Sequence, residues 1–553
     1  MPAGSKGKGA TGRPAPKVRI VFQPTGLRVS VDAGTDVLSA ARQAGIFLGG
    51  VCGGAGTCGK CRVLVVEGRK RRPALACQFR PDRTLAIEVP AETAAGAAQI
   101  LADGVYVEVI PRPSIFPVEE EGRPFLSVNG ERVPLPRPLG RCLGVAFDLG
   151  TTTLVASLFD LATGKRLAVA SSLDPQSSLG EDVVSRINLS VADREAPARL
   201  RSLLVQEANR LIGRTCASVK APAGSVCDLV AVGNTFMHHS FLGLPVKTLA
   251  ESPYSPATTR EREMPAAELG LRTGKLGRAF VPPPVAGFLG SDAVAGALAA
   301  GLDRVKGPTL YIDLGTNGEL LLAFDGRILG ATTAAGPAFE GAQIECGMRA
   351  AEGAISSVQL LREEGRVKGK LVIETIGGKP ARGIAGSGLV DAVAALLDAG
   401  AVDRRGNLAE GHPLVERDPG GKLAVLCRKP RRIHLSQHDI RSLQLAKAAV
   451  AAGTDVLLDN AGITGEDLDR VLLAGAFGNY LDRRSARRIG LLPPVEINRV
   501  LGLGNAASTG AGMMLVSVDE RKRALELSKR IEYIELAGND RFRELFVDCL
   551  AFP

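Results

Sequence analysis

The chain of 553 residues is 45% hydrophobic and 23% charged, which suits several globular domains and excludes a fibrous, collagen-like or disordered protein. Its net charge of +10 comes from dispersed Lys and Arg residues without a nucleic-acid-binding motif, so we expect no nucleic-acid partner. No segment has the roughly 18 apolar residues of a membrane helix, and the N-terminal residues lack the apolar core of a signal peptide, so we expect a cytoplasmic protein with no membrane association.

The N-terminal region predicts a disordered tail followed by a small domain. Residues 1–16 are rich in Gly, Ala, Lys and Pro and show no apolar pattern. After them, "KVRIVFQPTGLRVSV" predicts two strands joined by a turn, and "TDVLSAARQAGI" predicts a short helix with Thr35 at its N-cap. "RVLVVEG" and "TLAIEVP" predict two further strands. Residues 17–90 are therefore expected to form a β-grasp-like domain.

A glycine-rich loop in this domain carries three cysteines, and a fourth cysteine follows. The spacing is Cys52-x5-Cys58-x2-Cys61, with Cys77 after fifteen further residues. Only Cys58 and Cys61 have the short spacing of a zinc knuckle, and a bacterial [4Fe–4S] run is absent. Glycines provide room and backbone N–H donors for bridging sulfides. We predict a plant-type [2Fe–2S] cluster, with zinc or free thiols as the alternatives.

The remaining chain divides into a linker and a long α/β region. Residues 91–140 are Pro-rich in part and predict a linker with at most one small middle element. From residue 141 onward strands and helices alternate, and "VAFDLGTTT" resembles "YIDLGTNG" about 165 positions later. In both segments a buried strand ends in Asp-Leu-Gly-Thr. The recurrence predicts a duplicated α/β domain with one such loop in each half.

The paired loops favour a phosphate site. A turn of sequence DLGTTT or DLGTNG offers backbone N–H groups and hydroxyls to phosphate oxygens, and its Asp can hold Mg²⁺ directly or through water. A single copy would fit an ordinary hairpin turn, but two copies are harder to explain in that way. A third segment, "RVLLAGAFGNYLD", leads from a buried strand into small residues that can lie against a nucleoside.

In their order these motifs resemble the ASKHA superfamily of acetate and sugar kinases, heat-shock chaperones and actin. "GSDAVAGALAAG" and "GLGNAASTGAGMML" are similar to the connecting helices of that family, and their Ala/Gly faces would let two helices cross closely. The resemblance implies an ATPase domain over 141–553, with lobe I at about 141–300, lobe II at about 301–500, and a connecting helix and tail at about 501–553. The expected fold class is a multidomain α/β and α+β chain, with a β-grasp ferredoxin-like domain before a duplicated, two-lobe, actin-like domain.

A [2Fe–2S] domain ahead of an ASKHA domain resembles the reductive activators of corrinoid proteins. Other segments similar to that family are "VGNTFMHHSFLGLPV", "PPPVAGFLGSD", "GPAFEGAQIECGM" and "GIAGSGLVDAV". The resemblance implies an ATP-hydrolysing enzyme that passes an electron from its cluster to the inactive Co(II) corrinoid of a methyltransferase system and restores Co(I). The implied cofactors are the [2Fe–2S] cluster, ATP and Mg²⁺. The implied partners are the corrinoid protein and an external electron donor, either a ferredoxin or a reductase.

Two features distinguish this chain within that family. The segment before Asp148 is short for the separate middle domain that mediates dimerisation in some members, so a homodimer stays open. The C-terminal region contains only Cys549 where other members carry a further cysteine-rich cluster motif, which favours a single [2Fe–2S] cluster.

The candidate site residues follow from these motifs and from the resemblance. The expected iron ligands are Cys52, Cys58, Cys61 and Cys77. Asp148 and Asp313 would organise Mg²⁺, and Glu319 and Glu340 are candidates for positioning water. The nucleotide would be contacted by Gly150, Thr151, Thr152, Gly315, Thr316, Asn317, Gly386, Ser387, Gly475, Ala476, Phe477 and Gly478. A helix cap at Ser387 and a core aromatic at Phe477 are alternatives, and His238 and His239 are interpreted as structural.

Two other functions fit parts of the sequence. A small-molecule kinase of the ASKHA type would have no use for the ferredoxin domain. A ferredoxin-type electron carrier with a non-hydrolysing nucleotide-binding scaffold would not need two intact phosphate loops. A flavin or nicotinamide reductase would carry G-x-G-x-x-G after a first strand, and its absence implies that the electron arrives from a separate protein.

Overall fold

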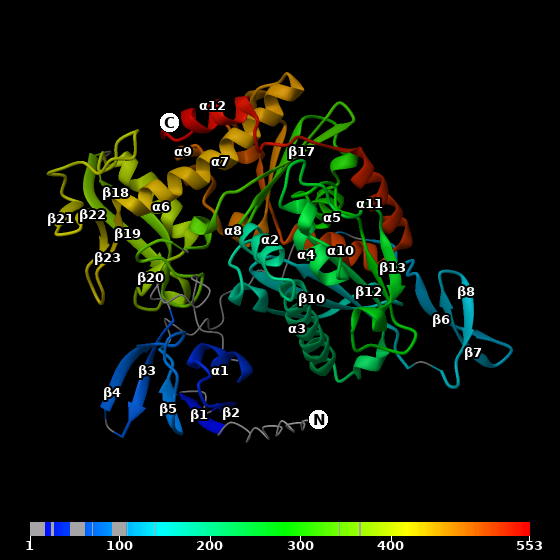
Figure 1. Cartoon of the computed structure of the whole chain (residues 1–553). Helices are drawn as coiled ribbons and strands as arrows, with labels where there is room; N and C mark the ends of the chain where they lie inside the picture. Colours follow the sequence, from blue (N-terminus) through cyan, green and yellow to red (C-terminus); the bar gives the residue numbers. More distant parts are fainter. Residues whose placement is uncertain are drawn as a thin grey trace, which may run out of the picture. The chain divides into compact units, whose positions relative to one another are not determined.

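The computed structural model describes residues 17–23, 27–44, 61–68, 70–90, 107, 109–138, 140–341, 343–363 and 366–553. These residues belong to two compact units, Met1–Ala97 and Ala98–Pro553 (Figure 1). The tail predicted at 1–16 and the expected ligands Cys52 and Cys58 lie outside the described residues.

The smaller unit is a five-stranded sheet of order β2-β1-β5-β3-β4 with one helix. Its elements are β1 (Lys17–Gln23), β2 (Leu27–Asp32), α1 (Val37–Gln43), β3 (Arg62–Glu67), β4 (Lys70–Leu75) and β5 (Leu85–Glu88). β1 pairs antiparallel with β2 and parallel with β5, which is the β-grasp arrangement. Alternate side chains of β1, Val18, Ile20 and Phe22, form its core. The prediction of a β-grasp-like domain is confirmed.

Two details of the smaller unit differ from the sequence prediction. The carboxylate that caps α1 belongs to Asp36 rather than Thr35, and it accepts from the backbone N–H of Ser39 at 2.9 Å. Strand β4 was not predicted, because its Lys70-Arg71-Arg72 start is exposed and shows no apolar alternation. A charged edge strand of this kind resists pairing with other chains and leaves little trace in a hydrophobic pattern.

The larger unit starts with a three-stranded meander within the segment predicted as a linker with one small element. Its strands are β6 (Ile115–Glu120), β7 (Arg123–Val128) and β8 (Glu131–Pro134). Ile115 and Leu126 join the core of the larger unit, and the Ser114 hydroxyl donates to the buried Asp228 carboxylate at 2.6 Å. The meander is therefore anchored to the unit that follows it.

Two six-stranded sheets follow, of order β11-β10-β9-β12-β14-β13 and β25-β24-β15-β16-β17-β26, and five strands of each repeat one order. The sixth strand differs, since β13 pairs with β14 whereas β26 pairs with β17 at the opposite edge. In each sheet the Asp-ending strand, β9 or β15, forms a hairpin with the next strand and pairs in parallel with a later one, β12 or β24. The predicted duplication is confirmed. The strands of the first sheet are β9 (Leu143–Leu149), β10 (Thr153–Asp160), β11 (Arg166–Leu173), β12 (Val226–Gly233), β13 (Arg262–Pro265) and β14 (Arg278–Val281). Those of the second are β15 (Thr309–Leu314), β16 (Gly318–Phe324), β17 (Arg327–Thr333), β24 (Arg470–Ala474), β25 (Val500–Gly504) and β26 (Ile531–Tyr533).

Each sheet packs helices on both faces. On the outer faces, one core contains α2 (Val183–Ala192), α3 (Ala196–Ser218) and α4 (Thr235–Leu242), and another contains α6 (Gly386–Asp398) and α7 (Gln437–Ala461). A third core contains α5 (Ser291–Ala300) and α10 (Ala506–Val516) together with strands of both sheets. The α5 and α10 layer therefore contacts both halves of the duplicated fold.

The alternation of side chains directs the aspartates of both Asp-Leu-Gly-Thr loops toward this shared layer. Along β9, Ala146 enters the core with α5 and α10, and along β15, Tyr311 does so. Asp148 and Asp313 lie two residues further on their strands, hence on the same faces.

Helices α5 and α10 cross with their backbones in contact. A Cβ on Gly510 of α10 would lie 2.0 Å from the carbonyl oxygen of Ala295 of α5, so only glycine allows this approach. A Cβ on the neighbouring Gly296 would lie 2.1 Å from the Tyr311 hydroxyl oxygen. The Ala/Gly faces predict such a crossing, and the structure contains it.

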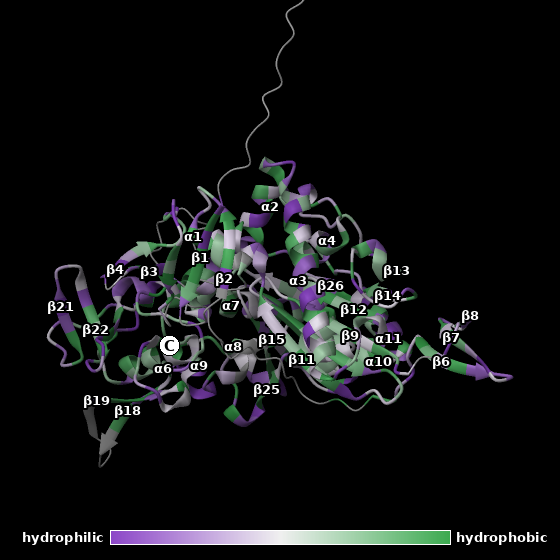
Figure 2. Cartoon of the chain, turned by 90° about the horizontal axis from the view of Figure 1, so that it is seen from below, coloured by the Kyte–Doolittle hydropathy of each residue, from purple (hydrophilic) through white to green (hydrophobic). Residues whose placement is uncertain are grey.

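Smaller elements surround the second sheet. They comprise β18 (Ala354–Glu363), β19 (Arg366–Thr375), β20 (Gly383–Ile384), β21 (Val415–Asp418), β22 (Gly421–Cys427), β23 (Ile433–Ser436), α8 (Gly475–Tyr480), α9 (Arg483–Arg488), α11 (Val518–Arg530) and α12 (Asp540–Asp548). Figure 2 shows hydrophobic colour along central strands such as β9 and β12, and hydrophilic colour on outlying ones such as β21.

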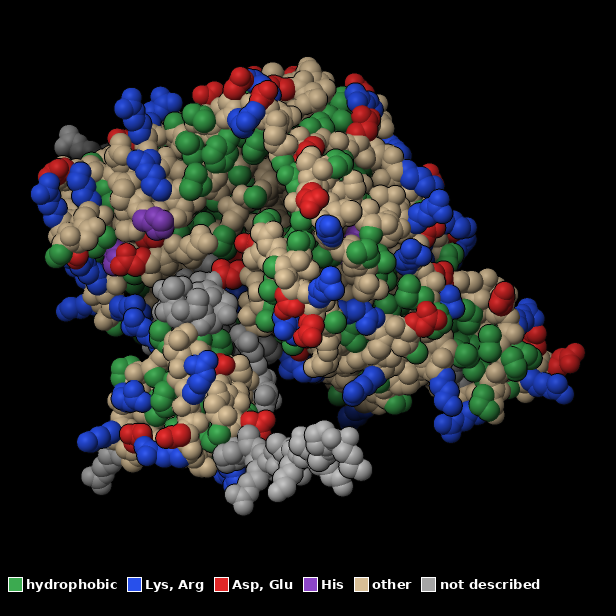
Figure 3. All heavy atoms as spheres, viewed as in Figure 1, with side chains coloured by type: hydrophobic (Ala, Val, Ile, Leu, Met, Phe, Trp, Pro, Cys, Tyr) green, Lys and Arg blue, Asp and Glu red, His purple; other side chains and the backbone are tan. Residues whose placement is uncertain are grey.

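Basic side chains are dispersed over the visible face in Figure 3 and alternate there with acidic ones. Many are paired, as Arg327 is with Glu532 at 2.6 Å and Arg541 with Asp459 at 2.8 Å. Among the described residues, no helix is both long and apolar enough to cross a bilayer.

The helix crossing predicts opposite effects for two Gly→Ala substitutions. Gly510→Ala should destabilise the larger unit by about 2 kcal/mol or more, because the added methyl group overlaps the Ala295 carbonyl. Gly213→Ala, inside α3 with open space around its Cβ position, should stabilise by about 0.5–1 kcal/mol. Guanidinium unfolding followed by circular dichroism measures both, and equal effects would show that the crossing is not tight.

Candidate functional site

The first Asp-Leu-Gly-Thr loop is a tight turn between β9 and β10. The Gly150 N–H donates to the Thr153 carbonyl at 3.0 Å, and a Cβ on Gly150 would lie 2.6 Å from that oxygen. Fully buried Arg186 donates to the Thr151 carbonyl at 2.6 Å and to the Asp174 carboxylate at 2.6 Å. This buried ion pair fixes the backbone of the loop.

The second loop is a tighter turn between β15 and β16. The Gly315 N–H donates to the Asn317 carbonyl at 2.9 Å, and the Thr316 carbonyl accepts from the Gly336 N–H at 3.1 Å. No buried ion pair among the described residues clamps this loop, so its backbone depends on the segment that starts at Gly336.

One pocket of about 270 Å³ brings both loops together with three other segments. The predicted site residues that line it are Asp148, Gly150, Thr151, Thr152, Asp313, Gly315, Thr316, Asn317, Glu319, Glu340, Gly386, Ser387, Gly475 and Phe477. Gly478 does not line the pocket; its Cβ position faces Leu473 at 3.6 Å. The side chain of Ala476 lies outside the described part of the structure.

Four carboxyl groups converge at one end of the pocket: Asp148, Asp292, Asp313 and Glu319. Burial raises the pKa of Asp148 to about 6, although the Asn505 amide donates to it at 2.8 Å. Burial likewise raises the pKa of Asp313 to about 6 against the hydrogen bond from Tyr311 at 3.0 Å. Burial and then the charges of Asp148 and Asp313 raise the pKa of Asp292 to about 7, and burial raises the pKa of Glu319 well above its ordinary value. The proximity of these acids thus disfavours the ionised forms of Asp292, Asp313 and Glu319.

This donor set fits Mg²⁺ held partly through water. All donors are oxygens, the ligands that a hard divalent cation prefers, and a cation would relieve the mutual repulsion. Among the described residues, no three Asp, Glu, His or Cys side chains lie close enough to chelate an ion by themselves. Mg²⁺ usually keeps several waters and binds through one or two carboxylates plus substrate phosphates. Carboxylates that are too far apart to chelate an ion directly therefore still suit Mg²⁺.

The hydroxyls of the two loops meet in the middle of the pocket. Thr152 Oγ1 and Thr316 Oγ1 lie 3.0 Å apart, and Thr316 donates to Glu340 Oε1 at 2.6 Å. Thr152 lies 3.3 Å from both Glu340 oxygens. The Thr151 hydroxyl instead accepts from the Asn234 amide at 2.8 Å, which leaves its own proton for a ligand.

The segment predicted to lie against the nucleoside differs in detail from an open loop. Gly475–Tyr480 is the short helix α8 and not an open loop. Gly475 has φ of +83°, and a Cβ there would lie 2.6 Å from Asp313 Oδ1, so a larger residue would obstruct the site. The Phe477 ring stacks on Phe339 with centroids 4.8 Å apart and planes 20° apart. Phe477 is thus part of the core and also lines the pocket.

The other predicted residues have structural contacts. Gly386 starts α6, and a Cβ there would lie 1.7 Å from the Phe339 carbonyl oxygen. The Ser387 hydroxyl donates to the Ser356 carbonyl at 2.9 Å, and Ser387 lies inside α6 rather than at its N-cap, Ala385. His238 and His239 are buried in α4 and do not line the pocket, in line with their structural interpretation.

The pocket is also lined by residues that were not assigned from the sequence, among them Asn234, Asp292, Arg349, Tyr480 and Asn505. Asn234 and Asn505 cap α4 and α10 and at the same time donate to Thr151 and Asp148. Each follows a Gly at the end of a buried strand, in "VGNT" and "GLGNA", so the recurring Gly-Asn pair was an available signal. Arg349 is the one cationic side chain among the described lining residues, and no motif marks it.

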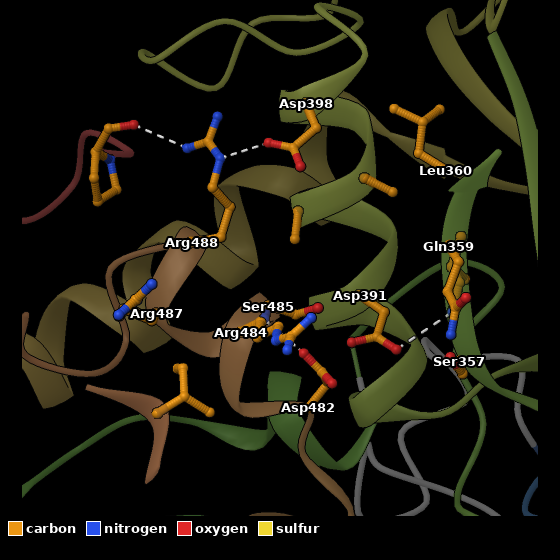
Figure 4. A pocket seen from close by; sticks show the side chains of 15 residues that line it. Ser357, Gln359, Leu360, Asp391, Asp398, Asp482, Arg484, Ser485, Arg487 and Arg488 are labelled. Atoms are coloured by element: carbon orange, nitrogen blue, oxygen red, sulfur yellow. Dashed lines mark hydrogen bonds and ion pairs between the residues drawn. The ribbon is translucent and has the colours of Figure 1, made fainter. Parts of the chain in front are cut away.

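A second cavity, of about 780 Å³, lies between β18, α6 and α9 (Figure 4). Its charged groups are largely paired within the protein. Arg488 donates to Asp398 at 2.7 Å and to the Pro553 carbonyl at 2.9 Å, and Arg487 donates to the Val495 carbonyl at 2.9 Å. These contacts make it a weaker candidate than the pocket between the loops.

The smaller unit holds two of the four expected iron ligands. Cys61 and Cys77 are buried, and their sulfurs lie 3.4 Å apart, which is contact without a disulfide bond. Thiolates at this separation can share one iron. The described part of the cysteine set therefore fits the [2Fe–2S] cluster.

Three family models match the chain. A model described as a 2Fe-2S iron-sulfur cluster binding domain matches residues 20–82, the RACo middle region matches 143–305, and the C-terminal ASKHA domain of RACo matches 307–553. The middle region of the family therefore corresponds to the first sheet. From the sequence alone, the short segment before Asp148 is instead the expected place for this region.

Relatives match over most of the chain. The corrinoid activation enzyme RamQ of Eubacterium limosum is 31% identical over 96% of this chain and 98% of its own. The [Co(II) methylated amine-specific corrinoid protein] reductase of Methanosarcina barkeri is 26% identical over 74% and 77%. The solved structure of a reductive activator for corrinoid, iron-sulfur protein is similar with a TM-score of 0.72, at 30% identity over 97% and 98%. These matches confirm the predicted fold class.

The raised pKa of Asp292 predicts that this carboxylate destabilises the metal-free protein at neutral pH. Asp292 titrates near 3.8 when unfolded and near 7 when folded, so stability falls as the pH rises between these values. Asp292→Asn should therefore stabilise by about 1–2 kcal/mol at pH 7.5 in EDTA, with a smaller gain at pH 4.5. Urea midpoints at both pH values measure the effect.

Asp303→Asn is the matched control with the opposite sign. Burial opposes the ionisation of Asp303, but the hydrogen bonds and charge of Arg523 outweigh it and hold the pKa of Asp303 below its ordinary value. This substitution should destabilise at pH 7.5, and its effect should persist down to the unfolded pKa near 3.8 and fade only as the pH falls below that value. A stabilised Asp303→Asn, or a destabilised Asp292→Asn, would contradict this electrostatic account.

Proposed function

The chain belongs to the family of reductive activators of corrinoid proteins, and on that premise we propose that it uses ATP to return an electron to the inactive Co(II) corrinoid of a methyltransferase system. The observation that carries this proposal is the single pocket lined by both Asp-Leu-Gly-Thr loops, α8 and four carboxyl groups. It would bind Mg-ATP, while the smaller unit would carry the electron.

The smaller unit would hold the [2Fe–2S] cluster through Cys52, Cys58, Cys61 and Cys77. When bound, such a cluster supplies one electron at a time. The buried positions of Cys61 and Cys77 would keep those thiolates from water and from oxidation. An external electron donor, a ferredoxin or a reductase, would reload the unit.

The larger unit would bind the nucleotide between its two sheets. The Thr151 hydroxyl, held by Asn234, has its proton free for a phosphate oxygen. Asp148 and Asp313 would hold Mg²⁺ through water, each kept in place by a hydrogen bond from Asn505 or Tyr311. Glu319 is our candidate for orienting the water that attacks the terminal phosphate, because it lies in the pocket beside Asp313.

ATP would act through the relative position of the two sheets. A ligand shifts an equilibrium only by its differential affinity for the two states. Since the loops come from different sheets joined by the α5 and α10 layer, a nucleotide that contacts both loops would favour one relative position of the sheets over the others. That shift would change how the chain holds the corrinoid protein, and hydrolysis would release that partner.

The central test is ATP-dependent formation of Co(I). The reduced protein is mixed with a Co(II) corrinoid protein, with and without Mg-ATP, and the Co(I) absorption band is followed. Asp148→Asn and Asp313→Asn should each lower the ATP-dependent rate roughly 10–100-fold, as expected for lost outer-sphere metal ligands, without altering the visible spectrum of the cluster. Equal Co(I) formation with and without ATP would favour a simple electron carrier and exclude the proposal.

The cluster itself predicts the loss of iron in Cys77→Ser. We expect the visible [2Fe–2S] absorption and the bound iron of the full chain to fall by at least half, because one thiolate ligand is removed. Cys427→Ser is the control, since the Cys427 thiol donates to the Lys429 carbonyl at 2.9 Å and a hydroxyl can do the same. An unchanged spectrum in Cys77→Ser would mean that another group is the fourth ligand.

A further inference from the structure

The Glu340 carboxylate lies where an anion would bind between the two loops. It belongs to the short 3-10 helix η6 (Pro337–Glu340) and reaches both loop hydroxyls. Thr316 Oγ1 donates to it at 2.6 Å, and Thr152 Oγ1 lies 3.3 Å from each of its oxygens. A carboxylate that accepts from hydroxyls of both loops makes the contacts that a phosphate group would make.

These contacts use the hydroxyl protons of both threonines. Each hydroxyl has one proton to donate. That of Thr316 goes to Glu340, and that of Thr152 goes to Thr316 at 3.0 Å or to Glu340. One anion can accept from both hydroxyls at their present separation, as the Glu340 carboxylate does. A phosphate that accepts from both threonines must therefore take the place of this carboxylate.

Two glycines flank the segment that carries Glu340. Gly336 and Gly341 flank η6 with φ of +77° and +71°, a conformation that glycine adopts without strain. The Gly336 N–H donates to the Thr316 carbonyl at 3.1 Å, so the segment is also tied to the second loop through its backbone.

Displacement of Glu340 would also change contacts outside the phosphate site. The adjacent Phe339 is buried and stacks on Phe477 of α8 at 4.8 Å. Its carbonyl oxygen packs against Gly386, the first residue of α6, where a Cβ would lie only 1.7 Å away. A movement of η6 large enough to free the carboxylate must shift at least one of these helices.

We propose that Glu340 is an internal phosphate substitute that holds the empty site shut, and that ATP binding replaces it and releases η6 to reposition α8 and α6. This proposal rests on the proposed function, since it assumes that the pocket binds nucleotide. It assigns Glu340 to the sensing of ATP and leaves the orientation of water to Glu319.

The test is the affinity of the full chain for the Mg²⁺ complex of a non-hydrolysable ATP analogue, measured by titration calorimetry. Glu340→Ala removes the competing anion and should tighten binding about tenfold, whereas Glu340→Gln, which keeps the size and removes the charge, should give part of the gain. In a Thr316→Val background the effect of Glu340→Ala should disappear, because the carboxylate has lost its main donor.

Glu345→Ala is the matched control. Glu345 lies in the same stretch of chain but is 59% exposed and pairs with His434 at 3.1 Å outside the pocket, so its removal should leave the affinity unchanged. Hydrogen exchange supplies the second readout. A peptide covering η6 should exchange faster when the analogue binds to the parent protein, and it should already exchange fast in Glu340→Ala.

The outcomes separate the two proposals. If the parent protein does not bind the analogue, the proposed function fails. If the parent binds it but Glu340→Ala binds with equal or lower affinity and exchange at η6 is unaltered, only the role assigned to Glu340 fails. Glu340→Gln covers the case in which Glu340→Ala does not fold, as judged by circular dichroism.

Discussion

The contact between α5 and α10 is the constraint on which the rest of the larger unit depends. Because Gly510 meets the Ala295 carbonyl without a side chain between them, one thin layer can touch both sheets. The same layer positions the acidic groups of the pocket. Asn505 at the start of α10 holds Asp148, and Gly296 of α5 makes room for Tyr311, which holds Asp313. The distance between the two helices therefore sets the distance between the Asp148 and Asp313 carboxylates. A change at the crossing would alter the geometry of the pocket.

The charges of the pocket favour a metal–nucleotide complex over either component. A free triphosphate would meet five carboxyl groups, from Glu340 and the four acids at the other end, and only one described cation, Arg349. A free divalent ion would meet carboxylates that are too far apart to chelate it by themselves. In the proposed complex, phosphate oxygens would complete the coordination of Mg²⁺, and the ion would offset the repulsion between phosphate and carboxylates.

The sequence predicted those parts of the site whose residues do one job each. Short sequence patterns predicted the Asp-Leu-Gly-Thr turns and the close crossing of the Ala/Gly helices, because neither feature depends on distant parts of the chain. Asn234 and Asn505 were not predicted as site residues, because an Asn before a helix is already explained by its role as the N-cap. Arg349 was missed because it follows no repeat, and β4 because a charged edge strand has no apolar period. The helical form of Gly475–Tyr480 depends on packing between Phe477 and Phe339, residues 138 positions apart in the chain.

The two loops share a sequence but differ in what holds them, and this difference assigns them different mechanical roles. The first loop is fixed through its Thr151 carbonyl by Arg186, whose partner Asp174 is also fully buried. Removing either charge would leave the other unpaired in the interior, so this loop resists movement. The second loop is tied at the Thr316 carbonyl to a segment flanked by two glycines. When a ligand displaces the Glu340 carboxylate, the segment with the weaker support is the one that moves. The first sheet therefore acts as the anchor, and movement enters the second sheet through η6, from where it can reach α8 and α6.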